Sequence, residues 1–338
     1  MTAPRMALPG GPPGAWARAL RTGLGSANAA PVYLVLLVIF VVSWVIVGLA
    51  GGSFLTVENV TSVLVRSVAL GIVSAGQTLV ILAGSLDLSV AYVISVAAVV
   101  SSVIMNGDPG RIVIAVVVVL GIGVAVGLTN GLLVTKLRVN PFIATLGVAL
   151  VLRGLLNAAF DNFAGKVAPQ FETLGYGGIG PLPWSVILLV VTVLAVWWLL
   201  RSTPFGHHLY AVGGGEETAR LSGVRSHRVI IGAHILCSLA AVLTGLFLVS
   251  RIRSGAPWIG PDGGYDLESI AAVVVGGTAL TGGRGGVWGT LAGVLILAVL
   301  DNLFNQLQFN SFLKDVVRGV IIIAAVAIYA QRQRRMSR

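Results

Sequence analysis

The chain is 338 residues long, and 56% of its residues are hydrophobic while only 10% are charged. Its mean hydropathy is +0.96, whereas a soluble domain carries about 25% charged residues. This composition excludes an ordinary soluble protein and predicts one that crosses a membrane several times. The net charge of +10 does not indicate nucleic acid, because the basic residues stand between apolar runs and report orientation. The single cysteine, Cys237, excludes an internal disulfide framework and a multi-cysteine metal site, so we expect no metal and no cofactor.

Ten apolar runs approach the roughly 20 residues that an α-helical membrane span needs. They are 31–50, 60–83, 84–105, 111–135, 141–160, 183–200, 229–250, 268–281, 285–305 and 312–330. The run 84–105 opens on a polar stretch, and 268–281 is short. If these runs are re-entrant and do not cross the membrane fully, the chain has eight or nine spans. Most runs are too long and too uniformly apolar for transmembrane β-strands of about 10 alternating residues. We therefore expect an all-α membrane bundle of about ten transmembrane helices (8–10).

The basic residues gather on one side of this predicted bundle. If both termini are cytoplasmic, the two ends of the chain and the inner loops hold 14 of the 22 Lys and Arg residues, and nine of the 12 acidic residues lie outside. This agrees with the positive-inside rule and predicts an N-in/C-in topology. We expect residues 1–30 to be a flexible cytoplasmic arm, 31–330 a single transmembrane domain and 331–338 a basic cytoplasmic tail.

Polar residues interrupt the apolar pattern in two places. Ser85 and Asp87 follow a glycine between two runs, where either can cap the next helix. The same stretch can instead be a broken helix that lines a polar path, since irregular backbone at membrane depth survives only in protein or around a cavity. Arg153, with Asn157 one turn further on, lies deep in its run, where a lipid-facing charge costs several kcal/mol. We expect Arg153 to point inward, either as a structural lock or as a lining residue.

Glycines recur every four residues at Gly123, Gly127 and Gly131. On a helix this spacing makes a smooth groove that lets a neighbouring backbone approach closely. The groove indicates tight packing within the bundle, or a sliding interface for alternating access.

The largest inner loop, 201–228, contains a pattern typical of a short surface helix. Acidic residues at its start and Arg220 at its end match the helix dipole. Glu216 and Arg220 have the favourable i, i+4 order, and Gly223 can terminate the helix. Because so short a helix is marginal alone in water, we expect a partner to dock on it, with a solvated connector as the alternative.

The glycine-rich segment 276–286 does not have the sequence of a phosphate-binding loop. It lacks the Gly-Lys-Ser/Thr ending, and no Walker A pattern occurs in the chain. We expect a tight cytoplasmic hairpin here, and no ATP binding by that mechanism.

Several sequence blocks resemble, in order, the permease subunits of bacterial ATP-binding-cassette (ABC) importers for monosaccharides, of the ribose permease type. The resemblance runs from about Phe54 to the last span. Its blocks are GQTLVIL (76–82), DLSV (87–90), PFIATL (141–146), LRG (152–154), YAVGG (210–214), ARLSGV (219–224), IAAVVVGGT (270–278) and GGRG (282–285). The chain departs from the family pattern at Gly215, where Asn is usual, and at Ser85 and Ala91, where glycine is usual.

The resemblance implies a pore-forming permease domain in a multi-pass protein of the bacterial plasma (inner) membrane, with no catalytic residues. In that family two permease chains pair, an extracytoplasmic solute-binding protein delivers the sugar, and ATPase subunits dock on the cytoplasmic loop. We expect a homodimer, and a pair of different chains stays open. The residues of the expected ATPase-coupling loop are Gly213, Gly214, Glu216, Glu217, Ala219, Arg220, Leu221, Ser222 and Gly223.

We expect the solute to cross a translocation path lined by hydroxyls and amides. Our candidates for hydroxyl, amide or charged groups that line it are Gln77, Asn130, Thr145, Arg153 and Asn157, with Asp87 as a helix cap or a path residue.

Three other functions are weighed against a monosaccharide importer. A nucleoside or another small polar solute fits the same family. A stand-alone secondary carrier usually shows intramembrane acids for ion coupling, and Asp87 is the only acid that we expect near the path. An integral-membrane enzyme needs a catalytic cluster, but the histidines show no metal spacing: His207, His208 and His227 fall in the inner loop and His234 in a span.

Overall fold

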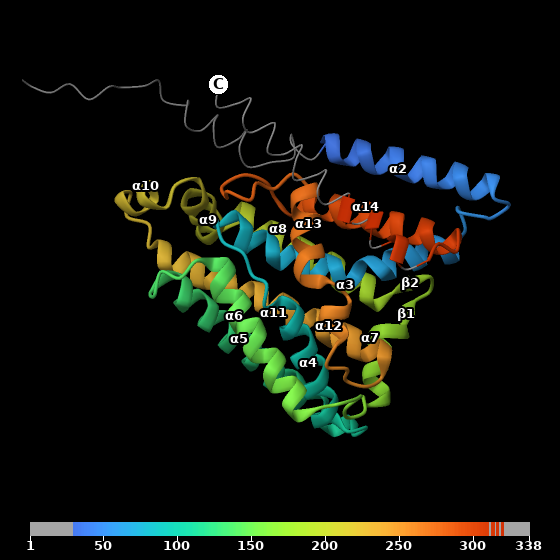
Figure 1. Cartoon of the computed structure of the whole chain (residues 1–338), viewed down its shortest axis with the longest axis horizontal. Helices are drawn as coiled ribbons and strands as arrows, with labels where there is room; N and C mark the ends of the chain where they lie inside the picture. Colours follow the sequence, from blue (N-terminus) through green and yellow to red (C-terminus); the bar gives the residue numbers. More distant parts are fainter. Residues whose placement is uncertain (1–29, 311, 315, 318, 321–338) are drawn as a thin grey trace, which may run out of the picture.

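The computed structural model describes residues 30–310, 312–314, 316–317 and 319–320, which form a bundle of helices (Figure 1). Its long helices are α2 (Ala30–Leu49), α3 (Val57–Leu82), α5 (Ile112–Thr135), α6 (Pro141–Ala159), α8 (Trp184–Ser202), α11 (Ser226–Ile252) and α14 (Val287–Gln306). Its shorter helices are α4 (Val90–Met105), η1 (Pro109–Arg111), η2 (Pro169–Glu172), α7 (Thr173–Tyr176), α9 (Pro204–Gly214), α10 (Glu216–Leu221), α12 (Ile259–Asp262) and α13 (Tyr265–Val275). The antiparallel strands β1 (Gly178–Ile179) and β2 (Leu182–Pro183) make a small hairpin.

Seven of the described helices are long and apolar enough to cross a membrane, which confirms a multi-span helical bundle. The predicted count of about ten and the N-in/C-in orientation stay predictions. The expected arm 1–30, apart from its last residue, and the tail 331–338 lie outside the described residues, as does most of the predicted span 312–330.

Two predicted spans are shorter in the structure than in the sequence analysis. The run 84–105 becomes helical only at Val90, and α4 has 16 residues, which makes it about 24 Å long. The run 268–281 stops at Val275, and α13 has 11 residues, or about 16 Å. A helix of that length covers only about half of a hydrocarbon core. Glycines with positive φ explain both boundaries, since Gly84 (+77°) and Gly277 (+86°) turn the chain.

The helix starts follow local capping chemistry. Thr56 precedes α3 and its side chain accepts a hydrogen bond from the Asn59 amide. Asn140 precedes α6 and accepts from the Phe142 amide, while Pro141 occupies the first turn, where its missing N–H costs nothing. These caps fix where two of the long helices begin.

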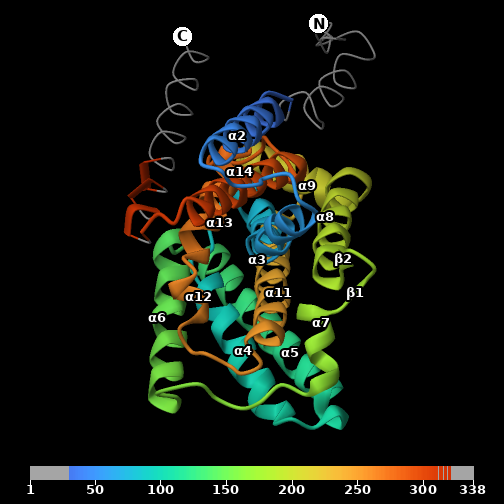
Figure 2. The same cartoon turned by 90° about the vertical axis from the view of Figure 1, so that its right-hand side faces the viewer.

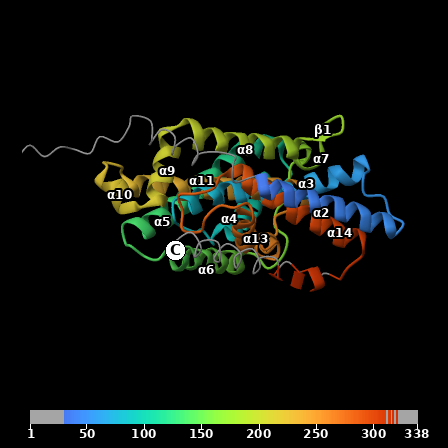
Figure 3. The same cartoon turned by 90° about the horizontal axis from the view of Figure 1, so that it is seen from above.

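Helices α3 and α11 form the centre of the bundle. They contact each other extensively, and α11 also packs on α4 and α5. Figures 2 and 3 show α6 and α8 on opposite sides of this centre, and α2 on the outside next to α14. Most of α3 is buried, whereas α2 and α6 expose most of their surface.

The glycine groove on α5 lies against α11. A Cβ atom added to Gly127 would stand 2.5 Å from Ile235 Cα, and one on Gly131 would stand 2.7 Å from Ile231 Cα. Such distances leave no room for a methyl group, so the tight-packing interpretation of these glycines is confirmed.

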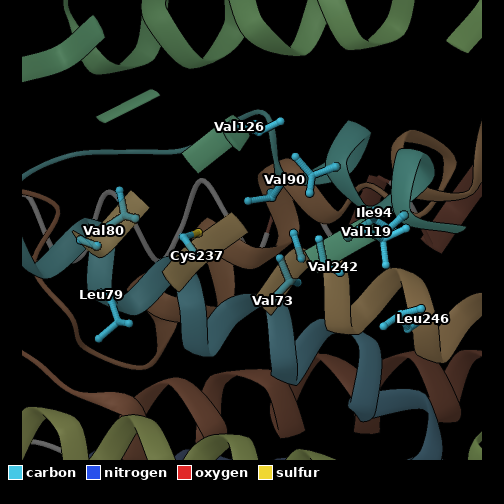
Figure 4. Packing of buried hydrophobic residues seen from close by; sticks show 14 of the residues in the cluster. Val73, Leu79, Val80, Val90, Ile94, Val119, Val126, Cys237, Val242 and Leu246 are labelled. Carbon is cyan, nitrogen blue, oxygen red and sulfur yellow. The ribbon is translucent and has the colours of Figure 1, made fainter. Parts of the chain in front are cut away.

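A hydrophobic core fills the space between α3, α4, α5 and α11. Figure 4 shows how Val73 from α3, Ile94 from α4, Val119 from α5 and Val242 from α11 approach one another. Cys237 belongs to the same core and is completely buried as a free thiol. This packing holds the non-helical turn between α3 and α4 in place.

Candidate functional site

A surface helix stands at one end of the bundle, far from the β1–β2 hairpin (Figure 1). The helix predicted within 213–223 is α10, at Glu216–Leu221. The sequence analysis missed α9, which precedes it: Thr203 accepts a hydrogen bond from the Gly206 amide, and Pro204 lies in the first turn. The signal for α9 was therefore a capping threonine directly before a proline.

The face of α10 combines an exposed ion pair with an exposed leucine. Arg220 Nη2 lies 2.7 Å from Glu217 Oε1, and both side chains are largely exposed. Leu221 exposes 80% of its surface. The predicted Glu216–Arg220 pair is wrong, because Glu216 turns to the start of α11 and accepts a hydrogen bond from Ser226 Oγ at 2.9 Å. Because Glu216 is bonded to Ser226, Arg220 pairs instead with Glu217, which lies about one turn before it on α10.

Three backbone segments meet at the end of α9, just before α10, at a contact that we call the glycine junction, made of residues 82–84, 213–214 and 282–283. The Gly283 amide donates to the Leu82 carbonyl at 3.0 Å. A Cβ atom on Gly213 would lie only 1.8 Å from that same carbonyl oxygen. Both Gly282 (φ +86°) and Gly283 (φ +71°) have left-handed backbone that favours glycine. The ends of α3 and α9 and the hairpin after α13 are therefore in direct backbone contact.

Tyr210 gives α9 a second contact with the glycine-rich hairpin. Its hydroxyl donates to the Gly285 carbonyl at 2.8 Å, and burial raises the pKa of Tyr210 to about 12. The phenol therefore stays protonated and keeps donating. Within the hairpin, the Gly286 amide donates to Thr278 Oγ1 at 3.2 Å and the Ala279 amide donates to the Arg284 carbonyl at 2.9 Å, as expected for a tight turn.

A buried polar cluster directly follows the end of α3, and its members are Ser85, Asp87, Ser89, Asn130 and His234. Asp87 Oδ1 accepts from the Ser89 amide at 2.9 Å and from Ser89 Oγ at 2.6 Å. Asn130 Nδ2 donates to Asp87 Oδ2 at 3.2 Å and to Ser89 Oγ at 2.8 Å. His234 places Nδ1 3.3 Å from Asp87 Oδ2 and Nε2 3.0 Å from Ser85 Oγ.

This cluster joins the α3–α4 turn to α5 and α11. The expectation that Ser85 or Asp87 caps the next helix is wrong, because the N-cap residue of α4 is Ser89, whose side chain makes no capping bond. Asp87 instead holds the turn before it, by accepting from the Ser89 amide. Sequence reasoning singled out Asp87 and Asn130 but missed His234. The signal was available, because a lone histidine in an apolar run needs a polar partner when it is buried.

The five predicted path residues fall into two groups. Gln77, Asn130 and Thr145 are completely buried. Gln77 Oε1 accepts from Cys237 Sγ at 3.3 Å, and Thr145 Oγ1 accepts from the Leu88 amide at 3.1 Å. These side chains therefore make contacts inside the chain.

Arg153 and Asn157 form the second group, on the exposed face of α6. The same helix exposes Gly147 and Gly154, where an added Cβ atom would meet nothing within 4 Å. Arg153 thus faces away from the interior of its own chain.

A bundle of apolar helices with an exposed, charged surface helix fits a membrane transport component. Residues 59–326 match the family described as branched-chain amino acid transport system / permease component. The chain is 37% identical over 300 residues to the ribose import permease protein RbsC of Escherichia coli (strain K12), covering 85% of this chain and 90% of that protein. It is 39% identical over 290 residues to RbsC of Bacillus subtilis (strain 168), covering 84% and 88%.

A third relative is the L-arabinose transport system permease protein AraH of Escherichia coli (strain K12). It is 36% identical over 311 residues, which cover 89% of this chain and 92% of that protein. No solved structure matches the chain. The chain belongs to the permease family that these matches define, which confirms the resemblance seen in its sequence. It is a multi-pass inner-membrane transport component rather than an enzyme.

Proposed function

We propose that the chain is the membrane-spanning subunit of an ABC importer that takes up a monosaccharide, with a ribose-like sugar as the first candidate. The observation that carries the proposal is α10, which exposes Leu221 beside a charged pair and directly follows the α9 segment of the glycine junction. A helix of only six residues is marginal alone in water, which favours a partner that covers it. The names of the relatives support the solute, since they are permeases for ribose, L-arabinose and fructose.

The proposed partner on α10 is a cytoplasmic ATPase subunit, and an extracytoplasmic protein would deliver the solute at the opposite end. The coupling residues would be those of the segment 213–223. When the ATPase moves α10, the end of α9 moves with it. Because Gly213 touches the Leu82 carbonyl without an intervening side chain, that movement reaches the end of α3 and the buried polar cluster beyond it.

Exchanging the charges of Glu217 and Arg220 tests this docking surface. The double variant Glu217→Arg/Arg220→Glu keeps an ion pair on the helix but reverses what a partner meets. We expect uptake and co-purification of the ATPase to fall at least about tenfold, which corresponds to a loss of about 1.4 kcal/mol of binding free energy. The measurements are sugar uptake by whole cells and the amount of ATPase subunit that co-purifies with the tagged chain.

The matched control is the exposed pair Asp108 and Arg111, which lies 3.2 Å apart at the other end of the bundle with the same i, i+3 spacing. Its charge exchange is expected to leave ATPase recovery unchanged. Normal coupling in the α10 variant would contradict the docking role of Glu217 and Arg220.

We further propose that the exposed face of α6 meets a second, identical permease chain across the translocation path. A guanidinium at membrane depth costs several kcal/mol against lipid, so Arg153 needs water or protein beside it. The open glycines Gly147 and Gly154 permit close approach of another helix. Arg153 and Asn157 would then line the path, while the buried Gln77, Asn130 and Thr145 would support its wall from behind.

The solute itself is tested by uptake into cells that express the complete transporter. Labelled D-ribose, L-arabinose, D-fructose and a nucleoside are compared at equal concentration. Saturable, ATP-dependent uptake of a monosaccharide supports the proposal. Preference for the nucleoside would move the substrate class to the alternative within the same family.

A further inference from the structure

A polar cavity of about 730 Å³ opens between α3, α11, α13 and α14. Helices α3 and α13 begin beside it and α11 and α14 end beside it, so it lies at the end of the bundle opposite α10 (Figure 1). Its volume is within the range of roughly 300–1,000 Å³ that is usual for small-molecule sites. None of the predicted path residues lines this cavity.

The cavity wall carries charged groups of both signs from four helices. The main polar groups are those of Glu58, Arg66, Arg251, Tyr265, Glu268 and Asp301. Arg66 Nη1 and Asp301 Oδ2 face each other at 3.8 Å, a separation too long for a hydrogen bond. Arg66 Nε donates to Ser62 Oγ at 3.4 Å on the same helix, and the guanidinium carries further N–H donors at the cavity wall.

The inner part of the cavity is apolar. Phe247, which is almost completely buried, lies there with Leu70 and Ala69. A wall of carboxylates, guanidiniums and hydroxyls around an apolar floor matches a molecule that has hydroxyl groups on its rim and C–H groups on its faces. Counting Asp262 as well, four acidic residues and two arginines line the cavity, so an anionic solute would be repelled.

We propose that this cavity is an entry site for the imported solute and takes a neutral, polyhydroxylated molecule of pentose or hexose size. The proposal rests on the importer function and deepens it by naming where the solute first binds to the permease. Carboxylates accept hydrogen bonds from sugar hydroxyls, and the arginines donate to hydroxyl and ring oxygens.

Two helices connect the cavity to the glycine junction at the end of the bundle that carries α10. Helix α3 runs from the cavity to Leu82 in the glycine junction, and α13 runs from the cavity to the hairpin that contains Gly282 and Gly283. A solute that bridges α3 and α13 therefore contacts the two helices that lead to the segments meeting α9 in the glycine junction. Solute binding at this site can therefore shift the glycine junction, which is the same contact that a movement of α10 would shift.

Cysteine protection tests the site directly on the full chain in lipid nanodiscs. Ser62 lines the cavity and is partly exposed, whereas the native Cys237 is completely buried, so Ser62→Cys supplies the reactive thiol. We expect D-ribose, L-arabinose or D-fructose, at about ten times its dissociation constant, to slow maleimide labelling about tenfold by mass action. Labelling of the control Asp108→Cys, on an exposed loop outside the cavity, is expected to stay constant.

The other probes separate the alternatives. Protection by choline would indicate a site for a cationic ligand, and protection by ribose 5-phosphate a site for an anionic one. Protection by a purified, sugar-free solute-binding protein would indicate a docking surface. Protection by any of these without protection by a neutral sugar would overturn the proposal, as would ready labelling that no neutral sugar slows. Sugar uptake by the complete wild-type transporter is measured in parallel, so failure of the entry site is distinguished from failure of the importer function.

Discussion

Gly213→Ala is expected to abolish coupled uptake and to lower the stability of the protein. The added Cβ atom would lie 1.8 Å from the Leu82 carbonyl oxygen and 2.5 Å from the Gly283 nitrogen. Both neighbours are backbone atoms, so the clash is relieved only if α9 separates from the end of α3. Overpacking typically costs about 1–3 kcal/mol, and here the added Cβ atom would also crowd both atoms of the Gly283–Leu82 hydrogen bond.

Gly121→Ala on α5 is the matched control, because nothing lies within 4 Å of its added Cβ atom and it belongs to neither the glycine junction nor the coupling segment. Thermal unfolding in detergent, sugar uptake and sugar-stimulated ATP hydrolysis are measured for both variants with the ATPase present. We expect Gly121→Ala to behave as wild type. If Gly213→Ala matched it in all three measurements, the glycine junction would not transmit movement from α10.

Asp87→Ala is expected to destabilise the protein by about 3–5 kcal/mol, the usual cost of removing one partner from a buried pair. The substitution leaves His234 Nδ1 and Asn130 Nδ2 without their carboxylate in a fully buried site. It also removes the acceptor that holds the Ser89 amide before α4. Uptake should be lost because the α3–α4 turn loses its connection to α5 and α11.

Two further variants make this test specific. Asp161→Ala removes an exposed carboxylate, and such surface changes usually stay within about 0.5 kcal/mol. In the double variant Asp87→Ala/His234→Ala the second substitution should cost less than it does alone, since contacting residues are not additive. If Asp87→Ala had the same thermal unfolding midpoint as the wild type, the cluster would contribute little to the stability of the fold.

The sequence was most informative where length and hydrophobicity decide the structure. Long apolar runs such as 111–135 and 229–250 correspond closely to α5 and α11, because a membrane helix must satisfy all its backbone groups internally. The α5 glycine spacing also predicted a close contact that the structure contains. These features depend on the residues of one segment alone.

Features that depend on several segments were not predictable in the same way. The run 268–281 was counted as a span although its glycines end α13 at Val275, since apolar composition does not reveal where a turn replaces a helix. His234 was set aside as an isolated histidine, and only the fold brings it to Asp87. The cavity beside Arg66 was missed for the same reason, because its wall combines residues of α3, α11, α12, α13 and α14.

The prediction that Arg153 points inward is wrong for the single chain, because the chain alone does not contain what surrounds α6 in the membrane. The physical argument that a membrane-depth charge needs water or protein is unchanged, but the side chain lies on the outside of α6. If the path forms between two chains, a residue exposed on one chain is interior to the pair. The same argument then places Arg153 against the second permease chain rather than within its own.

The most direct test of the account is purification of the tagged chain from its native membrane in mild detergent, followed by mass spectrometry of the intact complex. The account predicts two copies of this chain together with near-stoichiometric subunits that carry a Walker-motif ATPase. The Glu217→Arg/Arg220→Glu variant should then lose those subunits while the two permease chains remain together. A chain that purifies alone and supports sugar uptake without ATP would contradict the account and favour a stand-alone carrier.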